Sequence, residues 1–186
     1  MIYRKLKLSE IISVHKKHMR KDFRREEIKP LIAVIFLVLF GRSECIGAFE
    51  NGVLASYAII VKSKSCPYIL LDYLAVVGDR RGEGIGGKML DHLQKRFGGI
   101  IIEVENPDFA ANASAQTTME RRIAFYIKNG FVMTDVLCNL FTVEMNIMMY
   151  GPALCSDEVL FALDSLYSAM FTKSIRKKHV FLRKVS

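Results

Sequence analysis

Residues 69–105 read ILLDYLAVVGDRRGEGIGGKMLDHLQKRFGGIIIEVE, and this stretch decides the fold. Residues 69–77 are almost continuously apolar, which is typical of a strand covered on both faces. Residues 85–97 place their apolar side chains on one helical face, and residues 100–105 return to a strand pattern. Strand, helix and strand in this order form a β-α-β unit, whose two strands we expect to run parallel.

Two helices are predicted before this unit. Ser9 is a suitable N-cap for a helix over residues 10–21. Pro30 and Gly41 bound the ten apolar residues 31–40, which we interpret as a buried helix because a membrane-spanning helix needs about 20 residues. A membrane-binding or partner-binding surface is the alternative interpretation of this segment.

A hairpin and a mixed sheet complete the predicted fold. Asn51-Gly52 separates apolar runs at residues 44–49 and 53–61, which favours a two-residue hairpin turn. The later segments are predicted as a loop at 106–118, a helix at 119–128, a β-rich stretch at 131–150, a helix from Ser156 or Asp157 to about 171, and a strand at 179–185. We therefore predict an α/β fold with a mixed, mainly antiparallel sheet, one parallel pair and helices on both faces. It forms one domain over residues 1–186, of which 151–186 are a C-terminal extension.

Composition narrows the function classes. Half of the residues are apolar and a quarter are charged, which excludes a disordered chain. The four cysteines contain no CxxC pair, so we expect a cytoplasmic protein without disulfides or a metal site. The net charge of +8 suits an anionic ligand. The basic stretches at 15–25 and 173–184 lack the interleaved aromatics of a nucleic-acid binder, so we interpret them as solvated faces.

A glycine-rich turn joins the first strand of the β-α-β unit to its helix. Residues 80–87 read RRGEGIGG, and glycines at a helix start let backbone N–H groups and the positive helix end approach an anion. The turn therefore predicts a pyrophosphate site. A flexible turn, with glycines that only allow close helix-strand packing, is the alternative.

Two cofactor classes can use such a turn. Gly82, Gly84 and Gly87 fit the GxGxxG pattern of dinucleotide-binding proteins, and Glu103 follows about 20 residues later, where a ribose-binding carboxylate belongs. However, charged residues 79–81 interrupt the passage from the strand to the first glycine, and a doubly wound sheet needs more than one crossover. An NAD(P)-binding domain is therefore the weaker hypothesis.

Two motifs resemble the GNAT superfamily of acetyl-CoA-dependent N-acyltransferases. Its Arg/Gln-x-x-Gly-x-Gly/Ala signature follows a Leu-Ala-Val strand, and residues 81–86 match it directly after residues 74–76. Its late helix carries a tyrosine and is followed by Gly-Phe, which Tyr126 and Gly130-Phe131 match. The resemblance covers residues 44–131, and the two motifs occur in the family's order.

The resemblance implies an N-acetyltransferase that moves an acetyl group from acetyl-CoA directly to a primary amine. It places the pantetheine arm along Leu74, Ala75 and Val76, and the pyrophosphate against Arg81, Gly82, Glu83, Gly84, Ile85, Gly86 and Gly87. Many members carry an asparagine seven residues before the tyrosine, where this chain has Met119. The nearby Arg121 and Arg122 are candidates for the cofactor contact that is usually made there.

The resemblance also assigns the proton transfers. Tyr126 would protonate the leaving thiolate, although an ordinary core aromatic is the alternative. An alkylamine with a pKa near 10 must lose a proton before it attacks, which calls for a carboxylate. Glu103 and Glu105 share one face of their strand and Asp72 interrupts the apolar strand; we prefer Glu103, with a structural ion pair as the alternative.

The expected partners are acetyl-CoA and an amine of unknown identity. Neither nucleic acid nor a membrane is expected, and a homodimer is left open. A domain that binds acyl-CoA without catalysis is the second hypothesis.

Overall fold

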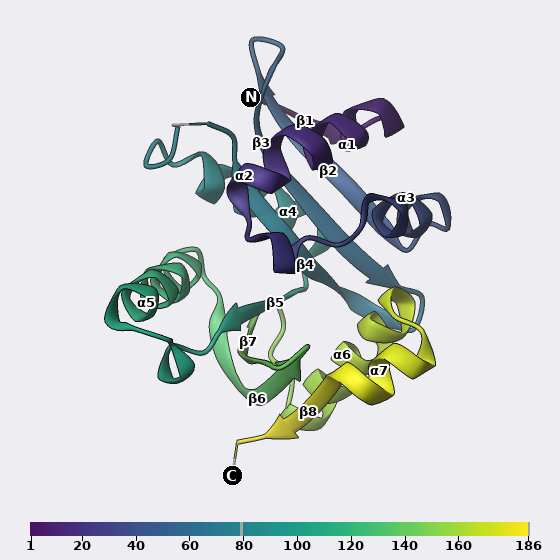
Figure 1. Ribbon diagram of the computed structural model, residues 1–186, viewed down its shortest axis with the longest axis vertical. Helices are drawn as coiled ribbons and strands as arrows, with labels where there is room; N and C mark the ends of the chain where they lie inside the picture. Colours follow the sequence, from purple (N-terminus) through teal and green to yellow (C-terminus); the bar gives the residue numbers. More distant parts are fainter. Residues whose placement is uncertain (79, 186) are drawn as a thin grey trace. The chain divides into compact units, whose positions relative to one another are not determined.

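The computed structural model describes residues 1–78 and 80–185 (Figure 1). Asp79, one of the charged residues that argued against a dinucleotide-binding turn, lies outside the described residues. By its internal contacts the chain forms two compact units. The first unit consists of Met1–Lys62 and Leu71–Leu93, and the second of Ser63–Leu70 and Gln94–Ser186.

The first unit is built on neighbouring strands in the order β1-β2-β3-β4. These strands are β1 (Ile2–Lys5), β2 (Ser43–Glu50), β3 (Val53–Ser63) and β4 (Cys66–Val76). Its helices are α1 (Leu8–Val14), a π-helical turn (His15–Met19), α2 (Arg20–Asp22), a 3-10 turn (Arg25–Glu27), α3 (Leu31–Leu39) and α4 (Ile85–Phe97), which continues beyond this unit. The short strand β1, which was not predicted, pairs antiparallel with β2.

The predicted hairpin between β2 and β3 is confirmed. Asn51 and Gly52 both have positive φ angles, 51° and 79°, as a two-residue hairpin turn requires. Antiparallel pairing continues through the partners Glu50↔Val53 and Ser43↔Val61.

The first helix differs from its prediction at both ends. It begins at Leu8 rather than Glu10, because the backbone N–H of Lys7 donates to Glu10 Oε2 at 2.7 Å and closes the start of the helix. Ser9 is therefore not the cap. The expected helix to residue 21 is interrupted by the π-helical turn, which buries His15 and Met19.

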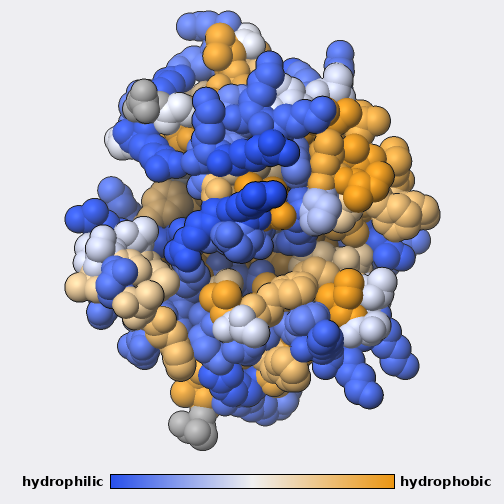
Figure 2. All heavy atoms as spheres, in the orientation of Figure 1, coloured by the Kyte–Doolittle hydropathy of each residue, from blue (hydrophilic) through white to orange (hydrophobic). Residues whose placement is uncertain are grey.

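The interpretation of residues 31–40 as a buried helix is wrong, although α3 itself forms as predicted. Val34 and Leu37 are buried, whereas Ile32 and Leu39 are 74% and 70% exposed. Figure 2 shows this hydrophobic surface as the orange area over α3. Because every residue of the helix is apolar, its sequence carries no polar face to mark the side that meets solvent.

The second unit has the antiparallel strand order β5-β7-β6-β8. These strands are β5 (Ile100–Glu105), β6 (Val132–Leu140), β7 (Val143–Tyr150) and β8 (Val180–Lys184). The first residues of β4 also belong to this unit and run parallel to β5, with Ile69↔Ile100 and Leu70↔Ile101 as partners. The predicted β-α-β unit, and with it a mixed α/β fold with one parallel pair, is confirmed.

The helices that lie wholly in the second unit are α5 (Ala113–Lys128), α6 (Ser156–Met170) and α7 (Lys173–His179). The prediction of a loop up to residue 118 is wrong, because the Asn112 side chain accepts the Ala115 N–H at 2.9 Å and starts α5 six residues earlier. The N-cap of α6 is Cys155 rather than Ser156 or Asp157. The basic helix α7, capped by Thr172, was not predicted.

Within residues 1–78 and 80–185, no helix is long and apolar enough to span a membrane. The same part of the chain contains no group of three His, Cys, Asp or Glu side chains that could hold a metal ion. Cys45, Cys66 and Cys138 are buried, and Cys155 is exposed.

We expect the glycine that follows β7 to tolerate no side chain. Gly151 has a φ of 115°, and a Cβ there would stand 2.3 Å from the carbonyl oxygen of Gly98. Gly151→Ala should lower the free energy of unfolding by about 3 kcal/mol or more, from backbone strain and overpacking together. Chemical denaturation followed by circular dichroism measures this loss.

The matched control is Gly52→Ala. Gly52 also has a positive φ, but no heavy atom of the part of the chain that the structure describes lies within 4 Å of a Cβ there. Its substitution should cost only about 1 kcal/mol, from the backbone conformation alone. Equal losses for the two variants would show that the close approach to Gly98 has no role.

Candidate active site

The turn between β4 and α4 has the open backbone that an anion site needs. Gly82 and Gly84 have φ angles of 92° and 75°, in the region that side chains rarely adopt. Among residues 1–78 and 80–185, no heavy atom lies within 4 Å of the position that a Cβ would occupy at either glycine. The space beside this backbone is therefore open to a bound group.

The backbone donors at the start of α4 fit a pyrophosphate. The Lys88 N–H donates to the Gly84 carbonyl at 3.1 Å, which begins the hydrogen bonding of the helix. The N–H groups of Ile85, Gly86 and Gly87 precede that bond and lie at the positive end of the helix dipole. Acetyl-CoA carries a pyrophosphate, which is the kind of group that N–H donors at a helix N-terminus bind.

Two arginines flank the glycines in different ways. Arg80 donates to Glu50 at 2.6 Å and to Glu83 at 2.8 Å, and these carboxylates raise the pKa of Arg80. The Arg81 side chain is 70% exposed and lies 3.6 Å from Asp22. Arg81 therefore remains the better placed of the two to meet a phosphate. Glu83, which the resemblance places against the cofactor, contacts Arg80.

The predicted pantetheine strand is the last part of β4. Ala75 is buried, whereas Leu74 and Val76 are half-buried on the other face of the strand. The strand is continued by a hydrogen bond from the Val77 N–H to the Ala55 carbonyl at 2.9 Å.

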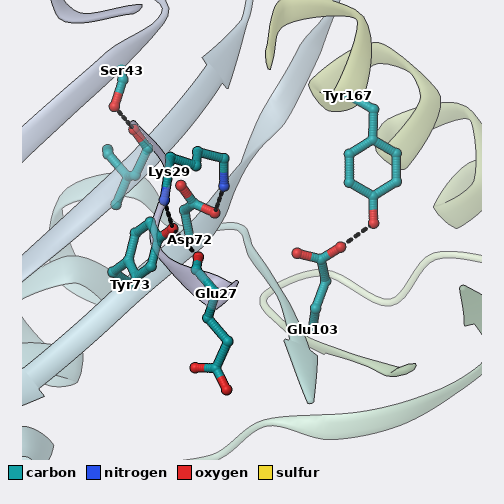
Figure 3. Close-up of polar contacts among 8 residues, drawn as sticks. Glu27, Lys29, Ser43, Asp72, Tyr73, Glu103 and Tyr167 are labelled. Carbon is teal, nitrogen blue, oxygen red and sulfur yellow. Dashed lines mark hydrogen bonds and ion pairs between the residues drawn. The ribbon is translucent and has the colours of Figure 1, made fainter. Parts of the chain in front are cut away.

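Asp72 lies in a buried ion pair of the first unit (Figure 3). Its side chain is 7% exposed, and Lys29 Nζ donates to its Oδ1 at 2.6 Å. The neighbouring Tyr73 hydroxyl donates to the Glu27 carbonyl at 2.6 Å and accepts the Lys29 N–H at 3.0 Å. This arrangement matches the structural ion pair that the sequence analysis kept as the alternative to catalysis.

Glu103 projects from β5 toward a tyrosine of α6, within the second unit (Figure 3). The Tyr167 hydroxyl donates a hydrogen bond to Glu103 Oε1 and lies 3.4 Å from Cys138 Sγ. Burial raises the pKa of Tyr167 well above its usual value, so its hydroxyl keeps its proton. The hydrogen bond therefore holds the Glu103 carboxylate in one orientation.

Glu105 shares the face of Glu103, as the alternation along the strand predicted. Both are half-buried, whereas Val104 between them and Ile102 before them are buried. Arg122 Nη1 lies 3.2 Å from Glu105 Oε2, so this candidate base and this candidate cofactor residue are brought together as an ion pair. Arg121 is exposed on α5.

Tyr126 lies near the end of α5, among aromatic rings. Its ring centroid lies 5.2 Å from that of Phe125 and 5.4 Å from that of Phe131. Burial raises the pKa of Tyr126 to about 12. The hydroxyl therefore remains protonated at neutral pH, as a proton donor must be.

Comparison with known protein families decides between the two cofactor classes. The model of the acetyltransferase (GNAT) domain matches residues 41–133, which is half of the chain and includes the glycine-rich turn. The chain belongs to the GNAT acetyltransferase family. The resemblance stated from the two motifs is thereby confirmed, and the dinucleotide-binding interpretation of the turn is set aside.

Individual GNAT relatives agree with this membership. The chain is 33% identical over 113 residues to the protein named "Putative acetyltransferase YjbC" of Bacillus subtilis strain 168. That match covers 56% of this chain and 56% of the relative, so the chain spans about half the length of the curated protein it matches.

Solved GNAT structures share the fold. A "Putative acetyltransferase from GNAT family" of Bacteroides thetaiotaomicron matches with a TM-score of 0.74 at 18% identity, covering 90% of this chain and 97% of that one. An aminoglycoside 6'-N-acetyltransferase complexed with coenzyme A matches with a TM-score of 0.61 at 15% identity, covering 83% and 99%. At these identities the likeness concerns the fold.

Two residues that contact the candidate carboxylates of this GNAT chain, Lys29 and Tyr167, were not predicted from the sequence. Tyr167 is 64 residues away from Glu103, on a helix outside the part that resembles the family. Tyr167 is fully buried, as are Val159, Leu163 and Leu166 of the same helix. A tyrosine at a buried helix position needs a hydrogen-bond partner for its hydroxyl, and this is the clue that the sequence offered.

We expect Tyr167 and Glu103 to be energetically coupled. In a double-mutant cycle of Tyr167→Phe and Glu103→Gln, the coupling energy should be about 1–3 kcal/mol, because the bond joins a buried hydroxyl to a carboxylate. Urea denaturation of the four proteins provides the values. Tyr150→Phe replaces Tyr167→Phe in the control cycle and should couple to Glu103→Gln by less than about 0.5 kcal/mol. Additive losses at positions 167 and 103 would contradict the hydrogen bond.

Proposed function

We propose that this protein is an N-acetyltransferase that moves the acetyl group of acetyl-CoA onto a primary amine. The observation that carries the proposal is the turn at residues 81–86, where the family signature coincides with an open, positively polarised backbone. The neighbour complexed with coenzyme A supports a donor of this class.

The chain's own residues divide the work of binding. The N–H groups of Ile85, Gly86 and Gly87 hold the pyrophosphate, and Arg81 adds a positive charge from the loop. The backbone of Leu74, Ala75 and Val76 binds the pantetheine arm, as the resemblance implies. Acetyl-CoA supplies the activated thioester, so no nucleophile of the protein is needed to form a covalent intermediate.

Two side chains are proposed to move protons. Tyr126 donates a proton to the departing thiolate, and its pKa of about 12 keeps that proton available at neutral pH. Glu103 accepts the proton that the ammonium of the acceptor has to lose. Tyr167 orients this carboxylate through its hydrogen bond.

The two other candidate carboxylates each lie beside a cation. Asp72 lies 2.6 Å from Lys29 and Glu105 lies 3.2 Å from Arg122. Each of these carboxylates is engaged by a cation, which fits a structural role. A protein that binds acyl-CoA without turnover remains the second hypothesis, and substitution of Tyr126 separates the two.

Acetyl-CoA should stabilise the protein, and NADH should not. At a hundredfold excess over its dissociation constant, a ligand that binds only the folded state adds about 2.7 kcal/mol of stability. A thermal-shift titration with acetyl-CoA, CoA, NADH and NADPH measures this. Gly84→Val should abolish the shift because its side chain fills the open space, whereas Gly52→Val, with a similar φ in the hairpin, should retain it. A shift with the nicotinamide cofactors alone would overturn the proposal.

Replacement of the Tyr126 hydroxyl should slow turnover without loss of the cofactor. For Tyr126→Phe we expect kcat to fall by about a hundredfold or more, the usual contribution of a general acid, with unchanged acetyl-CoA affinity. Thiol release with a panel of amines measures kcat, and Tyr150→Phe serves as the control.

The pH profile gives a second readout. Because the Tyr126 pKa is about 12, the wild type should not lose activity to tyrosine ionisation between pH 8 and about 10. Undiminished turnover in Tyr126→Phe would remove this residue from the mechanism, and binding of acetyl-CoA without turnover on any amine would favour the second hypothesis.

A further inference from the structure

A cleft in the first unit is surrounded by positive charge. Its volume is about 650 Å³, and it is lined by His15, Arg20, Arg25, Ile28, Lys29 and Pro30. All six belong to the segment between α1 and α3, of which residues 15–25 were predicted to be a solvated basic face. Hydrophilic atoms cover the region of α2 in Figure 2. A volume of this size suits a small molecule rather than a single ion.

The positive charge of this segment exceeds what its own carboxylates neutralise. Residues 15–30 contain seven lysines and arginines but only three carboxylates. Asp22 accepts from Tyr57 at 2.9 Å and lies 3.6 Å from Arg81, and Glu27 lies 3.4 Å from Arg24. Two of the three carboxylates are thus directed to partners other than the residues of the cleft.

The arginines of the cleft keep their full binding capacity. Among residues 1–78 and 80–185, neither Arg20 nor Arg25 forms an ion pair, and Lys29 pairs with Asp72. Glu26, exposed on the same turn as Arg25, is the remaining carboxylate of the segment. An arginine presents a planar fork of donors that matches a carboxylate or a phosphate.

His15 gives a second, independent sign of a ligand. Its side chain is 8% exposed, and Nε2 donates to the Lys29 carbonyl at 2.8 Å. The other ring nitrogen, Nδ1, is buried without a hydrogen-bond partner in the described part of the chain. A buried polar atom without a partner costs free energy. Because Nε2 carries the proton of the ring, Nδ1 holds a lone pair, and the group that satisfies it is a hydrogen-bond donor such as the N–H of an amine.

We infer that this cleft binds the anionic group, a carboxylate or a phosphate, of a small molecule, and that this molecule is the acceptor amine. The second part rests on the proposed acetyltransferase function, whereas the first part rests on the cleft alone. Arg20 and Arg25 bind the anion, and the amine of the ligand donates a hydrogen bond to His15 Nδ1. The acceptor class is therefore an amine that also carries a negative charge.

The binding test uses simple anions and charge-matched variants. At low ionic strength, isothermal titration calorimetry measures binding of succinate and inorganic phosphate, with uncharged succinamide as the control ligand. Arg20→Gln/Arg25→Gln should weaken binding of the preferred anion at least tenfold. Lys16→Gln/Lys17→Gln removes the same net charge from exposed positions that do not line the cleft, and should change the affinity less than twofold.

The relative affinities of succinate and phosphate identify the anion class. Equal weakening by the two double variants would assign the effect to net charge and overturn the inference, as would a wild type that binds neither anion. Acetyl-CoA affinity should be retained by Arg20→Gln/Arg25→Gln. If it is lost as well, the cleft serves the phosphates of the donor and the inference fails.

A kinetic comparison separates this inference from the proposed function. If the protein acetylates amines, those with a carboxylate or phosphate should be preferred over their neutral amide analogues. Arg20→Gln/Arg25→Gln should raise KM for the anionic amine at least tenfold and leave kcat within about twofold. Acetylation without a preference for anionic amines would overturn the acceptor assignment alone. Anion binding without any acetylation would support the cleft and contradict the proposed function.

Discussion

The backbone of the turn between β4 and α4 is the constraint on which the rest of the site depends. Gly82 and Gly84 have positive φ angles, which are unfavourable for residues that carry a Cβ. This conformation leads the chain from the strand into the helix. Among the described residues, no heavy atom lies within 4 Å of a Cβ built on either glycine, so the backbone just before the first N–H groups of α4 is open. The same geometry that completes the β-α-β unit thus forms the helix end at which we propose that the pyrophosphate binds.

The central elements could be predicted because their signals are local. The bounds of α4 and β5 agree with the predicted residues 85–97 and 100–105. The amphipathic helix ends just before Gly98, whose positive φ terminates it. The hairpin followed in the same way from Asn51-Gly52. In each case, periodicity and a turn residue lie within a few positions of one another.

The contacts that determine the surroundings of Asp72 and Glu103 could not be predicted, because they join segments that are distant in the sequence. Asp72 meets Lys29 across 43 residues, and Glu103 meets Tyr167 across 64. The sequence shows only that a carboxylate lies in an apolar strand and therefore needs a partner. Which partner it finds depends on how the helices pack, and that choice decides whether the carboxylate is neutralised by a cation or oriented by a hydroxyl.

The exposed side of α3 has a consequence for the behaviour of the protein in solution. Its exposed hydrophobic patch, which favours contact with a second molecule, consists of Ile32, Phe36, Leu39 and Phe40. The net charge of +8, in contrast, makes the molecules repel one another. At 0.1 M, salt weakens this repulsion between charges that are more than about 10 Å apart, but it does not remove the hydrophobic attraction. We therefore expect colloidal stability to depend on ionic strength, because salt weakens the charge repulsion and leaves the apolar side of α3 exposed to other molecules.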